Sequence, residues 1–181
     1  GHPVLQLEGR DKVRGRGIYT TDLALDGMIH GAILRSPYPH AEILGIDICH
    51  AVAMPGVRAV ITGYDADRKY IHTGPKYADR VRVVGEEVAA VAAETPEQAQ
   101  AAARAIVVTY KELAAVFDVE MASASGAPVL HELDGRPPNV ARHTRADWGD
   151  VETQIASAAH LAQGTFRHGI VAPVCLETNA V

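Results

Sequence analysis

The sequence predicts a layered α/β domain, on the evidence of three segments that follow one another closely. Residues 88–93 are apolar on both faces, which suits a central strand. Residues 96–105 are rich in alanine and favour a helix, and residues 106–110 return as a β-branched and aromatic strand. A strand, a helix and a strand joined this tightly are typical of a sheet with a helix packed on it. The spacing leaves open whether the two strands are adjacent.

The helix has clear end signals. Thr95 can cap it, and Pro96 fits the first helical position because the missing N–H of proline would be unpaired there anyway. Gln98 is placed to complete a capping box with Thr95. The alanines that follow have small side chains, which allow the helix to approach a sheet closely. We therefore predict one well-capped helix from about Pro96 to Ala105.

Two turns interrupt the chain before this unit. Asp26-Gly27 lies between the apolar runs 19–25 and 28–34, and a glycine at such a place predicts a β-hairpin because it tolerates positive φ. Ser36-Pro37-Tyr38-Pro39 then ends the second strand, since its two prolines have no N–H to donate to a ladder.

Residues 42–48 alternate with the period of a strand that has one well-buried face. A short helix over 48–54 is expected next, closed by Pro55-Gly56, and residues 57–61 are expected to form another strand. In the strand expected over 42–48, one face would carry Leu44, Ile46 and Ile48, and the other face would carry Ile43, Gly45 and Asp47.

The chain changes character after Tyr110. Residues 122–128 and 134–139 are rich in Ala, Ser, Gly and Pro and show no periodicity, which predicts a linker laid over a surface. Beyond it, Asp150 can cap a helix that runs to about Ala159, and residues 161–166 can form a strand.

The composition excludes several classes of function. With 181 residues, 48% of them apolar and 22% charged, the chain can bury a core. A net charge of −5 and a pI near 6.0 give no general attraction to nucleic acid or to anionic membranes. No stretch approaches the roughly 18 apolar residues of a membrane span, and no secretory leader is visible. A cytoplasmic protein is expected, although Gly1-His2 resembles a cloning remnant and leaves open a native signal upstream.

Two groups of residues invite a metal or nucleic-acid hypothesis. His30, His40 and His50 recur every ten residues, a spacing that places them on no common face, and no Cys-x-x-Cys or His-x-x-x-His pair accompanies them. We expect surface or hydrogen-bonded core histidines instead. The basic arm formed by Arg10, Lys12, Arg14 and Arg16 is expected to be solvated or to contact another subunit, because the chain as a whole is acidic.

Cysteine and carboxylate chemistry is not favoured either. Cys49 and Cys175 lie far apart in apolar runs, so we expect reduced, buried thiols and neither a disulfide nor a nucleophile. The carboxylate pairs Glu86-Glu87 and Glu132 with Asp134 are expected to be surface charge, because neighbours on a strand point to opposite faces. Gly15-Arg16-Gly17 lacks the third glycine and the preceding strand of a dinucleotide loop.

Four blocks of sequence stand in an order that chance does not readily produce. They are Gly-Arg-Gly-Ile-Tyr-Thr-Thr-Asp at 15–22, Leu-Arg-Ser-Pro-Tyr-Pro-His-Ala at 34–41, Ala-Met-Pro-Gly-Val-Arg-Ala-Val-Ile-Thr-Gly at 53–63 and Val-Gly-Glu-Glu-Val-Ala-Ala-Val at 84–91. With them the chain resembles the large subunits of molybdenum hydroxylases, the xanthine dehydrogenase and aldehyde oxidase family. The resemblance is strongest from Gly9 to Tyr110.

This resemblance implies a domain organisation. Residues 1–119 would form an α/β hammerhead domain with a mixed sheet, residues 120–146 a linker, and residues 147–181 the beginning of an incomplete molybdopterin-binding domain. It also implies a molybdenum–molybdopterin cofactor in the full-length protein. The FAD and [2Fe-2S] groups would sit on partner domains or subunits.

The last residues are where the resemblance comes nearest to the active site. Residues 176–181 look like the strand by which family members enter the molybdopterin-binding domain, and Ile170-Val171-Ala172-Pro173 departs from the Gln or His usual just before it. The glycine-rich loop near the metal and the glutamate base of the family would lie beyond Val181. The resemblance therefore implies no catalytic, cofactor-binding or metal-ligating residue in this chain.

The function that follows is that of a non-catalytic scaffold within an enzyme that oxidises aldehydes or N-heterocycles such as purines, with oxygen from water. Its partners would be the rest of the large subunit and the iron–sulfur and FAD subunits or domains. The alternative is a free-standing protein-interaction or small-molecule-binding module. Because the strand candidates 161–166 and 173–181 lack partners, we also expect the tail to pack on the first domain or to form a homodimer.

Overall fold

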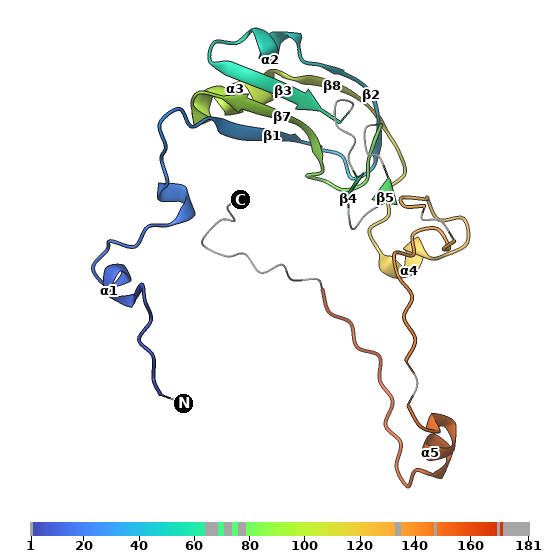
Figure 1. The fold of residues 1–181 in the computed structure, drawn as a ribbon. Coiled ribbons are helices and arrows are strands. Elements are labelled where there is room, and N and C mark those ends of the chain that lie inside the picture. Colours follow the sequence, from blue (N-terminus) through green and yellow to red (C-terminus); the bar gives the residue numbers. More distant parts are fainter. Residues whose placement is uncertain are drawn as a thin grey trace. The chain divides into compact units, whose positions relative to one another are not determined.

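The computed structural model describes residues 2–63, 69–70, 74–75, 79–132, 135–146, 148–169 and 171, with 69–70 and 74–75 described by their backbone alone (Figure 1). The chain divides into two units, residues 27–145 and the terminal segments 1–26 and 146–181. Each unit is described by itself. Within the described ranges, no helix is both long and apolar enough to cross a bilayer.

The first sheet of the 27–145 unit holds three antiparallel strands in the order β1-β7-β3 (Figure 1). These strands are β1 (His30–Arg35), β7 (Glu87–Ala93) and β3 (Val57–Thr62). The prediction of a central strand over 88–93 is confirmed, since β7 is paired on both sides.

The second sheet has the order β6-β2-β8 and is antiparallel as well. It holds β6 (Arg80–Val81), β2 (Ala41–Asp47) and β8 (Val107–Glu112), and β4 (Lys69–Tyr70) pairs separately with β5 (Gly74–Pro75). The α/β class is confirmed, but two antiparallel sheets replace the single mixed sheet that we expected. The reason is that the helix after β7 delivers the chain to the other sheet, so β8 never becomes a parallel neighbour of β7.

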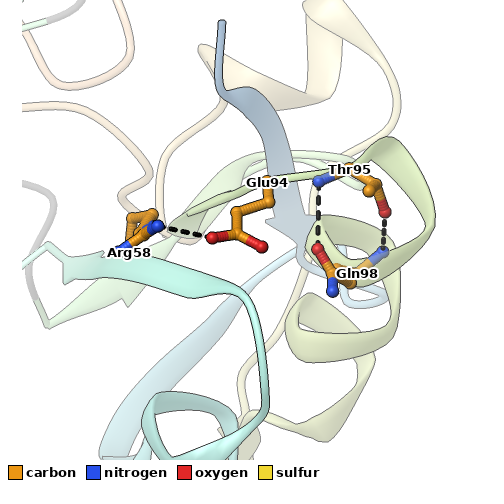
Figure 2. A network of polar contacts seen from close by, with 4 residues as sticks. All are labelled: Arg58, Glu94, Thr95 and Gln98. Atoms are coloured by element: carbon orange, nitrogen blue, oxygen red, sulfur yellow. Dashed lines mark hydrogen bonds and ion pairs between the residues drawn. The ribbon is translucent and has the colours of Figure 1, made fainter. Parts of the chain in front are cut away.

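That helix is α3 (Pro96–Ala105), and its predicted bounds and cap are confirmed. The amide of Gln98 donates to Thr95 Oγ1 at 3.2 Å, and the amide of Thr95 donates to Gln98 Oε1 at 3.1 Å (Figure 2). The preceding residue, Glu94, forms an ion pair with Arg58 of β3 (Figure 2). These contacts fix the direction in which α3 leaves β7.

The helix packs closely because its inner face is alanine. Ala99 and Ala102 are fully buried, and α3 contacts both β1 and β7. With Ala89 and Val91 of β7 these alanines belong to a core in which few side chains are large. Small residues on both surfaces bring the helix backbone near the sheet, so the core depends on close approach of backbone.

A short helix and a strand occur where predicted. The helix α2 (Cys49–Ala53) contacts α3 and β3, and β3 begins after Pro55-Gly56. Gly56 has φ of 78° and lies against the side chain of Gln98, so a Cβ there would strike the residue that caps α3. This position requires glycine for its conformation and for its space.

The buried face of β2 differs from the prediction. Opposite β8, the pairs Ile43–Tyr110 and Gly45–Thr109 are consecutive, so Leu44 is the extra residue of a β-bulge. The bulge inverts the alternation: Ile43 is buried, whereas Leu44 is 58% exposed. Alternation alone predicted Leu44 on the buried face, because a single inserted residue leaves no mark on the pattern.

The hairpin predicted around Asp26-Gly27 is wrong in its first strand. A turn is present, with φ of 75° at Gly27, and β1 follows it. The residues before it form the 3₁₀ helix η1 (Thr20–Asp22) instead. The Asp22 carboxylate accepts the Tyr19 amide at 2.9 Å, and such a local bond satisfies the backbone without a partner strand.

The terminal unit holds short helices, α1 (Gly9–Lys12) and α5 (Val151–Ser157). The predicted cap of α5 is confirmed, since Asp150 Oδ1 accepts the Thr153 amide at 3.1 Å. The strand expected over 161–166 is wrong, because these residues form no ladder with any described strand. The second predicted strand, 173–181, lies outside the described residues, and the domain boundaries remain predictions.

Candidate functional site

The Ser-Pro-Tyr-Pro-His turn carries the chain from the first sheet to the second and is buried at its first and last residues. Ser36 is 3% exposed and His40 is 4% exposed. The prolines have no N–H, so the amide of Tyr38 is the donor left between them, and it donates to Ser36 Oγ at 3.0 Å. The Ser36 hydroxyl in turn donates to the Tyr38 carbonyl at 3.1 Å. The Ser36 side chain thus satisfies both the amide and the carbonyl of Tyr38.

His40 joins this turn to the segment that follows β8. Its Nδ1 lies 2.6 Å from the carbonyl oxygen of Ala114, and its own carbonyl accepts the Leu113 amide at 2.9 Å. A carbonyl partner requires the proton on Nδ1, which leaves Nε2 as an acceptor in the neutral ring. Nε2 is buried and meets no hydrogen-bond partner among the described residues. His40 is thus a hydrogen-bonded core histidine, one of the two alternatives that the sequence left open.

Two tyrosines complete the cluster. The rings of Tyr38 and Tyr110 lie 5.1 Å apart at an angle of 55°, a tilted aromatic pair. Burial raises the pKa of Tyr110, and a hydrogen bond with the Ser36 side chain opposes part of that rise. A raised pKa keeps the phenol protonated at neutral pH.

A second motif packs against this turn. The amide of Gly85 donates to the Ser36 carbonyl, and the amide of Ser36 donates to the Glu86 carbonyl, both at 2.8 Å. The guanidinium of Arg35 donates to the Gly85 carbonyl at 2.8 Å. Blocks 34–41 and 84–91, which the sequence singles out separately, therefore meet in space and form one hydrogen-bonded junction.

Two residues that the sequence did not single out hold the loop after β8. Arg82 donates through Nε to the Leu130 carbonyl at 2.7 Å. Asn139 has φ of 62°, its Nδ2 donates to the carbonyls of Ala122 and Pro128 at 2.9 Å, and its Oδ1 accepts the Leu130 amide at 2.8 Å. The readiness of Asn for left-handed backbone was the available signal for this role.

The candidate metal residues are not gathered into a site. No group of three His, Cys, Asp or Glu side chains in the described part of the chain could hold a metal ion. These residues therefore do not fit a metal centre, and we derive no step through one. The basic arm is exposed as expected, with Lys12 paired to Glu8 at 2.9 Å.

The carboxylates of Glu86 and Glu87 make contacts that hold the fold together. Glu86 Oε2 accepts the Arg82 amide at 2.5 Å, and Glu87 pairs with Arg35 at 3.6 Å. Glu132 is exposed, and Asp134 lies outside the described residues. The Glu86 and Glu87 carboxylates thus contact different partners, the Arg82 amide and the Arg35 guanidinium.

The prediction for Cys49 is wrong in its burial. Cys49 is an exposed free thiol at the start of α2, and Cys175 lies outside the described residues. Apolar neighbours in sequence suggested burial, but the short helix turns Cys49 outward. A hydrogen bond to Asp47 and the negative charge of its carboxylate raise the pKa of the Cys49 thiol. The Cys49 amide in turn donates to Asp47 and lowers the pKa of that carboxyl. A raised pKa lowers the fraction of thiolate, the nucleophilic form, at neutral pH.

These contacts define an α/β domain of two antiparallel sheets, between which the chain passes, among other places, through the Ser-Pro-Tyr-Pro-His turn, through α2 and through α3. Residues 14–114 match the family described as aldehyde oxidase and xanthine dehydrogenase, a/b hammerhead domain. The chain belongs to this family, whose members are the large subunits of molybdenum hydroxylases.

Relatives of known name agree. The chain is 41% identical over 165 residues to a probable xanthine dehydrogenase subunit from Bacillus subtilis strain 168, covering 88% of this chain and 22% of that protein. It is 33% identical to the nicotine 6-hydroxylase large subunit from Paenarthrobacter nicotinovorans, covering 99% of this chain and 23% of that protein. The chain thus spans about a fifth to a quarter of the length of these relatives.

A solved structure gives the same result. Quinoline 2-oxidoreductase from Pseudomonas putida 86 superposes with a TM-score of 0.70 at 34% sequence identity, over 87% of this chain and 21% of that one. The hammerhead fold that the sequence predicted is confirmed.

Proposed function

We propose that this chain is a structural part of a molybdenum hydroxylase large subunit and contributes no catalytic, cofactor-binding or metal-ligating residue. The observation that carries the proposal is the match of 88% of this chain to 22% of a relative that is named a probable xanthine dehydrogenase subunit. The buried groups described above support it, because their hydrogen bonds hold strands and loops together.

We further propose N-heterocycles as the substrates of the parent enzyme. Xanthine, nicotine and quinoline, in the names of the three relatives above, are N-heterocycles. In such a reaction a carbon–hydrogen bond is replaced by a carbon–oxygen bond, water supplies the oxygen, and two electrons and two protons are released. The cofactors supply the redox chemistry, and the protein supplies position and a base.

The remaining expectations belong to the same proposal. Molybdopterin would be bound by the rest of the large subunit, and the electrons would pass to [2Fe-2S] and FAD groups on partner subunits or domains. Related chains carry names such as "large subunit" and "complex subunit gamma", which supports assembly with other chains. A cytoplasmic location is proposed with them.

The test compares this chain with the product of its complete reading frame. The purified enzyme should contain molybdenum and reduce a dye with xanthine, nicotine or quinoline, whereas the 181-residue chain should contain no molybdenum and show no activity. Aldehydes serve as the competing substrate class. Stoichiometric molybdenum in the 181-residue chain would refute the scaffold proposal, and an enzyme active on aldehydes alone would refute the substrate class.

A further inference from the structure

One face of the first sheet is apolar and partly exposed to solvent. Ala90 of β7 lies opposite Ile33 of β1 and Ile61 of β3, and directly opposite residues point to the same face. Ala92 in the same way lies between Gly31 and Ala59. We call these positions the outer strip: Gly31, Ile33, Ala59, Ile61, Ala90 and Ala92.

The strip faces away from the core. Val91, the residue between its two alanines, is 2% exposed and belongs to the core with α3. Ile33 and Ile61 are 47% and 46% exposed, although their neighbours Ala32, Leu34 and Val60 pack against the core. Covering a sheet face of this composition with another element lowers the free energy of the protein, because apolar surface is removed from water.

The composition of the strip says what kind of surface fits it. None of its members is charged or polar, and glycine and alanines between two isoleucines make a shallow apolar floor that a backbone can approach closely. Ion pairs stand at both ends of β7: Arg35 with Glu87, and Arg58 with Glu94. An apolar centre with charged groups at its edge is the usual anatomy of a stable interface.

We infer that an apolar segment from the remainder of the large subunit packs on the outer strip. This inference rests on the proposed function. The relative with 41% identity has about four fifths of its length outside the region that this chain matches, so a covering segment is available within one polypeptide.

The experiment measures thiol accessibility in a Cys49→Ser, Cys175→Ser background. Ile33→Cys and Ile61→Cys are made singly, with Leu44→Cys as the matched control, because Leu44 is 58% exposed on the other sheet. In the 181-residue chain all three thiols should react with a maleimide at similar rates. In the native enzyme from the complete reading frame, the thiols at positions 33 and 61 should react at about one tenth of their rate in the 181-residue chain or more slowly still. The control thiol at position 44 should keep its rate.

The other outcomes overturn either this inference or the proposed function. Unchanged rates at positions 33 and 61 mean an open strip, and equal slowing at position 44 means general shielding. Slow labelling already in the 181-residue chain identifies a second copy if light scattering finds a dimer, and a terminal segment of the chain itself if it finds a monomer. Fast labelling in a molybdenum-containing enzyme rejects the inference alone, whereas slow labelling in an enzyme without molybdenum rejects the proposed function alone.

Discussion

Residues 27–145 and the terminal segments are stabilised in different ways. In the first unit, hydrogen bonds join residues far apart in sequence, such as His40 with Ala114 and Arg82 with Leu130. In the terminal segments the hydrogen bonds described above are local, and Phe166 is 92% exposed. Capped helices therefore form in both units, but a core forms only where strands from distant parts of the chain pair.

The largest effect is expected from filling the interface between α3 and the sheet. Ala102→Leu adds volume to a fully buried position and should lower the free energy of unfolding by about 1–3 kcal/mol. Ala101→Leu is the matched control, because Ala101 lies one residue away on the exposed face. Urea unfolding of both variants checks this. Equal stabilities would mean that the core of this unit is not close-packed.

Gly56→Ala should come next. Alanine in left-handed backbone costs about 1–2 kcal/mol, and the new Cβ would also displace the Gln98 side chain. Gly27→Ala is the control, since Gly27 has a similar φ of 75° and no atom near its Cβ position. The difference between the two variants in urea unfolding measures the contact with Gln98. A Gly56 variant no less stable than the control would deny that contact.

Loss of the cap should cost less. Thr95→Ala removes the acceptor of the Gln98 amide and should lower stability by about 1 kcal/mol. Thr95→Ser keeps a hydroxyl and should retain most of that stability. Thermal melts of the two variants test this. If both lose the same amount, the capping hydroxyl is not what stabilises α3.

Removal of the tail should have a small effect on the 27–145 unit. A chain ending at Arg145 should unfold within about 0.5 kcal/mol of the full chain, because that unit keeps its core. The same pair of chains tests the predicted homodimer by light scattering. A full chain that is dimeric and a truncated chain that is monomeric would support the tail as the contact; a large loss of stability would contradict the division into two units.

The smallest effect concerns the acid sensitivity of α5. Hydrogen bonds from Thr153 lower the pKa of Asp150 below its ordinary value of 3.8. A depressed pKa means that the charged cap favours the helix above that ordinary value, and the benefit is lost as the pH falls through the folded-state pKa. An NMR titration of Asp150 should show this, with Thr153→Pro as the variant that removes the amide donor. An unshifted titration would remove Asp150 as the cap.

Local features of this fold could be predicted from the sequence, and non-local ones could not. Thr95 and Gln98 are three residues apart, so their cap could be predicted, as could the breaks at Pro37 and Pro39. The partner of β8 is β2, where Val108 pairs with Ile46. Neither segment contains a sequence signal that identifies the other as its partner strand. A mixed sheet was therefore expected in place of two antiparallel sheets.

The same distinction applies to the candidate site. The blocks around Ser36 and Gly85 were visible separately, but the hydrogen bonds that join them depend on how the two sheets are placed. The role of Arg82 was not predicted, because its partner is a backbone carbonyl at Leu130, and every residue offers a carbonyl. The exposure of Cys49 depends on the direction of a five-residue helix, which apolar neighbours do not determine.

The path β7–α3–β8 has a consequence for how this unit opens. Because the helix links a central strand of one sheet to an edge strand of the other, neither sheet can detach without pulling on it. Ile46 and Val108 strengthen the link, since both pack against the two core clusters at once. The sheets therefore form a single cooperative unit, and a fluctuation large enough to expose amides in one exposes amides in the other.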